Sequence, residues 1–347
     1  MKRAGGPTQI QSIQWLRALA ALAVVAFHAS LQLGDAFIVG AAGVDVFFVI
    51  SGFIMWSISA REPRPAAFMV DRIVRITPLY WLATGVMIFG ALAGLFPRVV
   101  LTPDHIVNSL LFIPHVSPSN HQVWPLLVQG WTLNYEMFFY ALFALTLFAP
   151  RALQAWLLCA IFSVLAGAGL LLKPDGVAAF YTDTIILEFA AGVLLAKLFA
   201  ANLRIGRVSA LALAAAGVAG FVIAHFEGDM GPRALVYGVP ALLLVAGVVG
   251  LERAGVSFHW RPATFVGDAS YAIYLFHTFA ISVLAKLVDF NAQPVLGVAL
   301  SFAGAVLVGA GAHILLERPV AALLRPQRRH AYMAWVRGLL APTRTSK

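Results

Sequence analysis

The amino-acid sequence predicts an all-α fold, a polytopic membrane helix bundle of about ten transmembrane helices. The 347 residues are 61% hydrophobic and only 11% charged, with a mean hydropathy of +0.86. A soluble domain of this size would carry about a quarter of charged residues. Apolar runs of about 20 residues, long enough to cross a bilayer, recur along the whole chain. The basic residues fall mainly in alternate connections between these runs, as the positive-inside rule requires.

Ten apolar runs are predicted to span the membrane: 12–31, 40–60, 76–96, 131–149, 152–172, 181–199, 207–225, 233–251, 269–288 and 294–316. The first run follows Lys2 and Arg3, as in a signal sequence, but it contains Arg17 and has no obvious small-residue cleavage site. We therefore expect it to be retained as a span. Residues 1–347 are expected to form one integral membrane domain. Its basic end, residues 317–347, is expected to be a cytoplasmic tail on the inner leaflet.

The distribution of Lys and Arg predicts that both chain ends are cytoplasmic. With ten spans and an inner N-terminus, 20 of the 24 basic residues fall on the inner side. The net charge of +9 is then explained by contacts with the lipid bilayer, and nucleic acid is not expected as a partner. The single cysteine, Cys159, excludes internal disulfides and a cysteine-built zinc site. No HExxH motif or other tight metal-ligand spacing occurs, so no metal is expected.

Two further stretches can be interpreted from composition. The connection 97–130 contains four prolines, and it is predicted to be a short interfacial segment followed by an extended cover over the outer mouth. The runs within 207–251 consist largely of Ala, Gly, Val and Leu. They are predicted to pack through small residues and to carry no chemistry.

The first span carries two ionisable groups on one face. Arg17 and His28 are eleven residues apart, which is about three helical turns. Arg17 is about 8 Å into the helix, so snorkelling to the inner surface is an alternative to a functional role. His28 is near the outer end, where simple solvation is the alternative.

Two carboxylates are predicted at the depth of His28. Asp45 opens the second span, where the helix dipole alone could favour it, but it lies one short hairpin from His28. We expect it to orient His28 and stabilise its imidazolium form. Glu136 lies five residues into the fourth span, which is too deep for an easy lipid-facing position, although it could instead point into the loop.

Further polar groups are predicted to face the bundle interior. Arg72 and Arg75 lie one turn apart at the inner mouth, either as ordinary positive-inside anchors or as a paired guanidinium site for phosphates. Ser270, Tyr274 and His277 share one face of the ninth span. These residues, together with Glu188, leave open a second function, a proton-coupled transporter or flippase of a glycan-related substrate.

Taken together, six segments in this order resemble the acyltransferase-3 family of integral membrane acyltransferases, most closely its exopolysaccharide-production members. They are WLRALAALAVVAFH, GVDVFFVISGF, RIVRITPLYW, GWTLNYEMFFY, GDASYAIYLFH and ERP, spread from about residue 12 to 320. Many relatives have Gly directly after the first-span Arg, where this chain has Ala18.

The resemblance implies O-acylation of an extracytoplasmic or lipid-linked glycan, such as an exopolysaccharide, at a bacterial inner membrane. The implied donor is a cytosolic acyl-CoA, commonly acetyl-CoA, and the implied partners are this donor and the glycan acceptor. We expect His28, Asp45 and Glu136 to be catalytic, with His28 as general base. Arg17, Arg72, Arg75 and Tyr274 are expected to bind the donor or stabilise developing negative charge. Direct transfer and an acyl-His28 intermediate both fit the sequence.

Overall fold

The computed structural model describes residues 10–31, 37–59, 64–227, 231–287 and 292–324, and the regular secondary structure in these ranges is helical, as predicted. The helices are α1 (Gln11–Ser30), η2 (Ile38–Ala42), α2 (Gly43–Ser59), α3 (Pro65–Leu92), α4 (Pro103–Leu110), α5 (Gly130–Thr146), α6 (Arg151–Leu172), α7 (Gly176–Thr182), α8 (Ile186–Ala200), α9 (Arg207–Glu227), η3 (Ala234–Gly238), α10 (Val239–Arg253), α11 (Arg261–Leu287), α12 (Pro294–Ala312), η4 (His313–Glu317) and α13 (Arg318–Leu324). The predicted tail is described only as far as Leu324, and residues 325–347 lie outside the described residues.

Each of the ten predicted runs contains a helix, and eight helical segments of the described chain are long and apolar enough to cross a membrane. The other two, α5 and α8, have 17 and 15 residues. Helix α8 starts at Ile186, later than the predicted run 181–199, because the Asp183 side chain accepts a hydrogen bond from the Ile185 backbone N–H at 2.8 Å. Such a bond closes an Asx turn, which separates α7 from α8.

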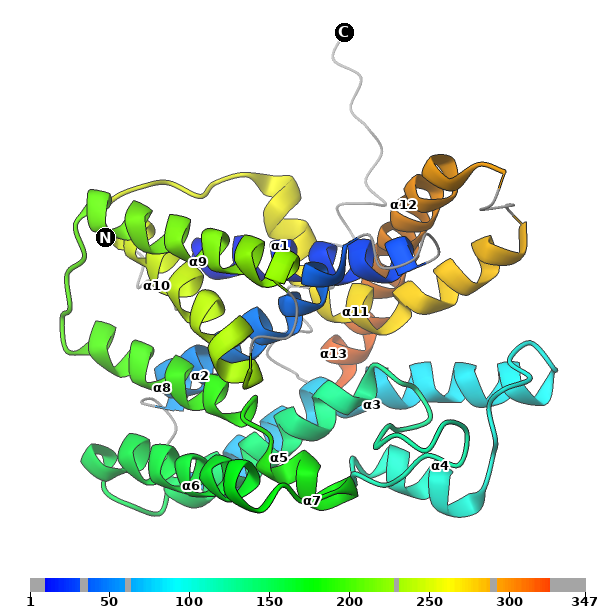
Figure 1. Cartoon of the computed structure of the whole chain (residues 1–347), viewed down its shortest axis with the longest axis horizontal. Helices are drawn as coiled ribbons and strands as arrows, with labels where there is room; N and C mark the ends of the chain where they lie inside the picture. The colour runs from blue at the N-terminus through cyan, green and yellow to red at the C-terminus, as the bar shows by residue number, and fades with distance from the viewer. Residues whose placement is uncertain (1–9, 32–36, 60–63, 228–230, 288–291, 325–347) are drawn as a thin grey trace, which may run out of the picture.

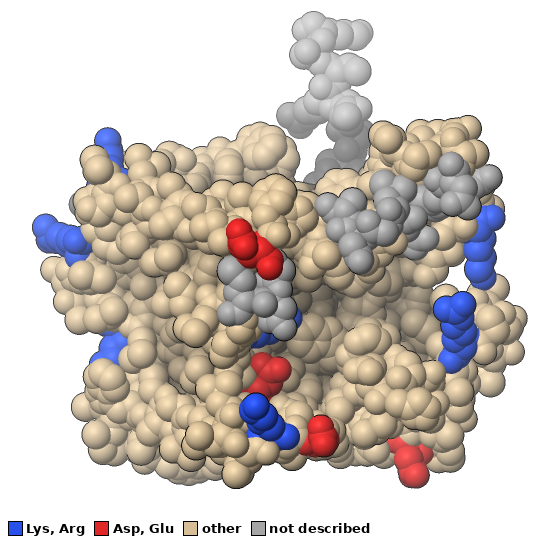
Figure 2. Space-filling model, viewed as in Figure 1, with Lys and Arg blue, Asp and Glu red and all other residues tan. Residues whose placement is uncertain are grey.

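Figure 1 shows the arrangement of these helices. Most of the long helices run across the view; α3, α5, α6 and α7 lie in its lower half, and α1, α9, α10, α11 and α12 in its upper half. The same face in Figure 2 is largely uncharged: Lys and Arg lie mainly toward its left and right edges, and a few acidic side chains, with some basic atoms near them, lie near its middle and lower edge. A face with few charged side chains is typical of a bundle that crosses a bilayer.

Helices α2 and α8 cross at two glycines. A Cβ atom added to Gly52 would lie 2.0 Å from the backbone oxygen of Phe189, and one added to Gly192 would lie 2.0 Å from that of Val49. Each glycine therefore receives the backbone of the opposite helix. Small residues permit this close approach in membrane helices. It brings the start of α2, which carries Asp45, beside the start of α8.

Small residues also join α9 to α10, as predicted for the stretch 207–251. A Cβ atom on Gly217 would lie 2.7 Å from the backbone of Leu244, and one on Gly247 would lie 2.4 Å from that of Ala214. A π-helical turn, η3, precedes α10. Pro240 lacks the N–H that would bond to residue 236, and its ring crowds that carbonyl, which favours a wider turn.

The connection after α3 contains a short helix, as predicted. Helix α4 begins with Pro103 and is capped by Thr102, whose hydroxyl accepts from the His105 backbone N–H at 3.3 Å. Nδ1 of His105 lies 2.6 Å from Nε2 of His115, which follows in the loop. Burial, followed by the nearby charge of His115, lowers the pKa of His105 from 6.5 to about 4. The connection after α3 therefore brings the imidazoles of His105 and His115 into contact.

Candidate active site

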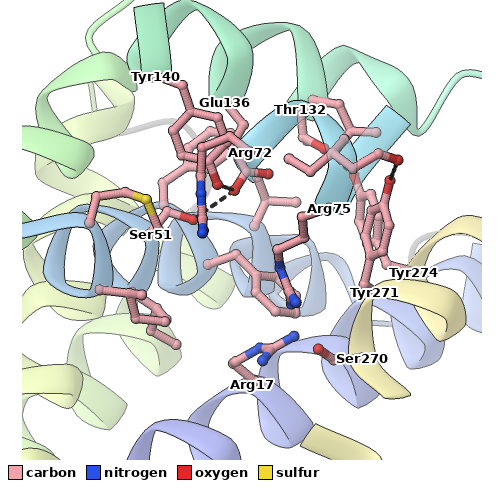
Figure 3. Close-up of a pocket in the computed structure, with 18 of the residues that line it drawn as sticks. Arg17, Ser51, Arg72, Arg75, Thr132, Glu136, Tyr140, Ser270, Tyr271 and Tyr274 are labelled. Carbon is pink, nitrogen blue, oxygen red and sulfur yellow. Dashed lines mark hydrogen bonds between the residues drawn. The ribbon is translucent and has the colours of Figure 1, made fainter. Parts of the chain in front are cut away.

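A cavity of about 310 Å³ lies between helices α1, α2, α3, α5 and α11. Figure 3 shows its polar side chains gathered from these five helices. Five of the seven predicted site residues line it: Arg17, Arg72, Arg75, Glu136 and Tyr274. His28 and Asp45 are not on its lining. The volume is at the lower end of the range for ligand pockets, about 300–1,000 Å³.

Three guanidinium groups enter this cavity. Arg17 comes from α1, and Arg72 and Arg75 come from α3, where their spacing of three residues puts them on one face. Arg72 forms an ion pair with Asp71, and Arg17 donates to the side-chain oxygen of Gln14 at 3.4 Å. The buried Nε of Arg72 has no hydrogen-bond partner among the described residues. An unpaired buried donor of this kind is unusual in a folded protein.

Glu136 provides the one carboxylate on the lining of this cavity, within the part of the chain that the structure describes. Its Oε1 accepts from the hydroxyl of Ser51 at 3.0 Å and from that of Tyr140, one helical turn later on α5. The two hydroxyls hold the carboxylate in place on the cavity wall. With three cations and one anion, the lining carries a net positive charge, which favours an anionic ligand.

Tyr274 closes the cavity on the side of α11. Its hydroxyl lies 2.9 Å from Oγ1 of Thr132 and 3.3 Å from the carbonyl oxygen of Gln129, both at the start of α5. Ser270, one turn earlier on α11, also lines the cavity. Two of the three residues predicted to share a face of α11 therefore reach the cavity, and the third, His277, does not.

His28 pairs with His277 rather than with a carboxylate. The two rings are 4.7 Å apart between centroids, and Nε2 of His277 lies 3.2 Å from Nδ1 of His28. The ring of His277 is in turn 6.0 Å from that of Tyr274. A row of three rings therefore connects His28 to the wall of the cavity.

The predicted contact between Asp45 and His28 is wrong. Asp45 is fully buried, and its two carboxylate oxygens accept from Nε and Nη2 of Arg233 at 3.0 and 2.8 Å. The carboxylate turns toward α8 and η3 because the glycine crossing of α2 with α8 places it on that side. Glu188, 2% exposed, lies beside this pair and interacts with both Asp45 and Arg233.

Arg233 is the residue that sequence reasoning missed. It begins the run 233–251, within the stretch 207–251 that is predicted to carry no chemistry, and it is one of the four basic residues predicted on the outer side. Its guanidinium also lies 6.0 Å from the ring of Trp131 and 5.5 Å from that of Tyr237. The sequence offered one signal that could have identified it: an arginine at the predicted outer end of a span, the same predicted end at which Asp45 and Glu188 lie.

The described residues contain no group of three or more His, Cys, Asp or Glu side chains that could hold a metal ion. The features that this part of the chain brings together are a cationic cavity, a carboxylate on its wall, and a histidine pair beside it.

Comparison with known proteins identifies the family. The acyltransferase-3 family model, described as an acyltransferase domain, matches residues 10–314. The exopolysaccharide production protein ExoZ of Rhizobium meliloti is 46% identical over 91% of this chain and 99% of its own length. The acyltransferase MdmB of Streptomyces mycarofaciens is 26% identical over 92% of this chain and 94% of its own. No solved structure shows a significant match. The chain belongs to the acyltransferase-3 family of membrane acyltransferases, a family linked to exopolysaccharide production.

Proposed function

We propose that this protein is an O-acyltransferase that moves an acyl group, expected to be acetyl, from cytosolic acyl-CoA to a hydroxyl of a glycan. The glycan is extracytoplasmic or lipid-linked, such as an exopolysaccharide. The observation that carries the proposal is the cationic cavity, with three arginines, one carboxylate and an unpaired buried donor on Arg72. The high identity to an exopolysaccharide production protein supports the choice of acceptor.

The donor is recognised by charge. Arg72 and Arg75 engage the phosphates of acyl-CoA, because guanidinium groups bind phosphates through two parallel hydrogen bonds. The free Nε of Arg72 is one such donor. A whole CoA molecule is larger than the cavity of about 310 Å³, so the phosphate groups and the acyl-bearing arm enter it while the adenosine stays outside.

Glu136 and His28 perform the proton work in this proposal. Glu136, held by Ser51 and Tyr140, binds or orients the hydroxyl of the acceptor. His28 acts as general base: it takes the proton of that hydroxyl as the oxygen attacks the thioester carbonyl. The carbon–sulfur bond breaks and the CoA thiolate regains a proton. Tyr274 or Arg17 donates to the oxyanion that develops on the carbonyl oxygen.

Asp45 has a different place in this proposal. Because its carboxylate binds Arg233, it acts by fixing the start of α2 against the start of η3. Direct transfer predicts sequential kinetics, whereas an acyl-His28 intermediate predicts ping-pong kinetics.

The orientation follows the positive-inside distribution of the sequence. We propose that the chain is one membrane domain with both ends cytoplasmic, in a bacterial inner membrane. This arrangement lets the arginines meet a cytosolic donor while His28 lies near the outer side. The basic tail then lies along the inner leaflet.

Purified protein supplied with radiolabelled acetyl-CoA and candidate glycans tests the proposal. We expect label on the glycan, released by mild base as an ester, and no label transfer by Glu136→Gln. The matched control is Arg98→Ala, an exposed position after α3 that should transfer label at the normal rate. Movement of unlabelled glycan across liposomes without label transfer would contradict the proposal and favour a flippase.

A further inference from the structure

Two histidines from distant parts of the chain form a pair beside the cavity. His28 lies in the last turn of α1, and His277 lies on α11, 249 residues later. His277 is fully buried, and its Nε2 is 3.2 Å from Nδ1 of His28. No carboxylate takes part in this contact within the described chain, so the protons on the two rings must be assigned from their other partners.

The proton of His277 is fixed by backbone carbonyls. Its Nδ1 lies 2.7 Å from the carbonyl oxygen of Tyr274 and 3.2 Å from that of Ile273. A carbonyl oxygen only accepts hydrogen bonds, so Nδ1 must carry the proton. A neutral imidazole has one N–H, which leaves Nε2 of His277 as an acceptor.

The same reasoning assigns the proton on the ring of His28. Its Nδ1 lies 2.9 Å from the carbonyl oxygen of Val24 and 3.2 Å from Nε2 of His277. Both of these atoms accept, so Nδ1 of His28 carries the proton and is shared between them. In the neutral ring, Nε2 of His28 is then unprotonated.

We propose that His277 is a positioning residue that holds His28 as the Nδ1–H tautomer, leaving Nε2 as its basic atom. The inference deepens the proposed function and rests on it for its kinetic consequence. His277 takes the part that the sequence assigned to Asp45, which the structure engages with Arg233 instead.

The pair also supports the charged form of His28 during transfer. Nε2 takes the proton of the glycan hydroxyl while the oxygen–carbon bond forms. The carbon–sulfur bond then breaks, and the same proton passes from Nε2 to the thiolate of CoA. Throughout, the Nδ1–H stays on His28 and donates to Val24 and His277, so the imidazolium keeps both acceptors.

The tautomer can be measured without the reaction. Protein carrying ¹⁵N-labelled histidine is observed by solid-state NMR, and the His28 signals are those lost in His28→Gln. We expect wild type to show a protonated Nδ1 and an unprotonated Nε2. His277→Leu, of similar volume but without an acceptor, should give a mixture of tautomers. His277→Gln, whose side-chain oxygen can accept from His28, should restore the wild-type signals. His121→Gln, in the exposed loop after α4, is the control.

Transfer kinetics give the second readout. His277→Leu should lower kcat about 10- to 100-fold with KM for acyl-CoA unchanged, the range seen for groups that orient histidines in metal sites. His277→Gln should recover most of this loss. A His277→Leu protein that keeps the Nδ1–H tautomer and normal kcat would overturn the proposal, as would a wild-type His28 protonated at Nε2. Absence of transfer by wild type, with the tautomer as stated, would refute the proposed function alone.

Discussion

Removing the guanidinium of Arg233 should destabilise the protein by about 3 kcal/mol. Asp45 is 0% exposed, and both of its oxygens accept hydrogen bonds from Arg233. Breaking a buried pair by removing one partner costs about 3–5 kcal/mol, because the other charge stays buried without compensation. The Arg233 side chain is 31% exposed, so water can partly replace it, which favours the lower end of this range.

A double-mutant cycle measures this interaction. We would compare wild type with Arg233→Met, Asp45→Asn and the double variant, by titrating each with SDS in mixed micelles and following helix content. Arg233→Met should cost about 3 kcal/mol, and the double variant should be more stable than the sum of the two single losses predicts. We expect a coupling free energy of at least about 1.5 kcal/mol, within the range for residues in contact. Additive losses, within about 0.5 kcal/mol, would refute the pairing.

Four other changes test separate parts of the structure. Arg75→Ala should raise KM for acyl-CoA about 10- to 100-fold, because it removes the equivalent of one charged hydrogen bond to the donor. A KM for Arg75→Ala equal to that of Arg98→Ala would show that Arg75 does not bind the donor. Glu136→Gln should lower kcat by about 10²–10⁴, and a rate near wild type would exclude Glu136 from the proton work. Gly52→Ala should cost about 1–3 kcal/mol in the same SDS titration, because its methyl group meets the backbone of α8; an unchanged midpoint would contradict the close crossing. His105 has a pKa of about 4 in the folded chain against 6.5 when unfolded, so the folded chain binds fewer protons at this site. The amide protection of α4 should therefore fall as the pH is lowered from 6.5 to 4 in wild type, but not in His105→Gln.

The fold class could be predicted from the sequence because the length of an apolar run and the placement of Lys and Arg are local properties. Each predicted run contains a helix, and the small-residue stretch 207–251 packs as expected. The length of α8 was less predictable, because an Asx turn at Asp183 separates α7 from α8 inside one apolar run. Hydropathy averages over such a turn and does not detect it.

The candidate site was predictable where its residues share a helix face. Arg72 and Arg75 are one turn apart on α3, so their meeting in one cavity follows from local geometry. Glu136 was expected at the depth of His28 and not at the inner mouth, and its place on the same lining as the two arginines was not predicted. The partners of the remaining residues come from distant segments. Asp45 meets an arginine 188 residues away, and His28 meets a histidine 249 residues away. Choosing between such partners requires the packing of whole helices, which one sequence without relatives does not specify.

Vectorial transfer across a sealed membrane tests whether the protein moves an acyl group from a donor on one side to a glycan on the other. Proteoliposomes would hold radiolabelled acetyl-CoA on the side of the chain ends and a membrane-impermeant glycan on the other side. For wild type we expect labelled ester on the glycan outside and free CoA inside. Both products should be lost in His28→Gln and Arg75→Ala, whereas Arg98→Ala should remain active. Label that stays with acetyl-CoA, or glycan that is acylated only when both substrates are on the same side, would contradict it.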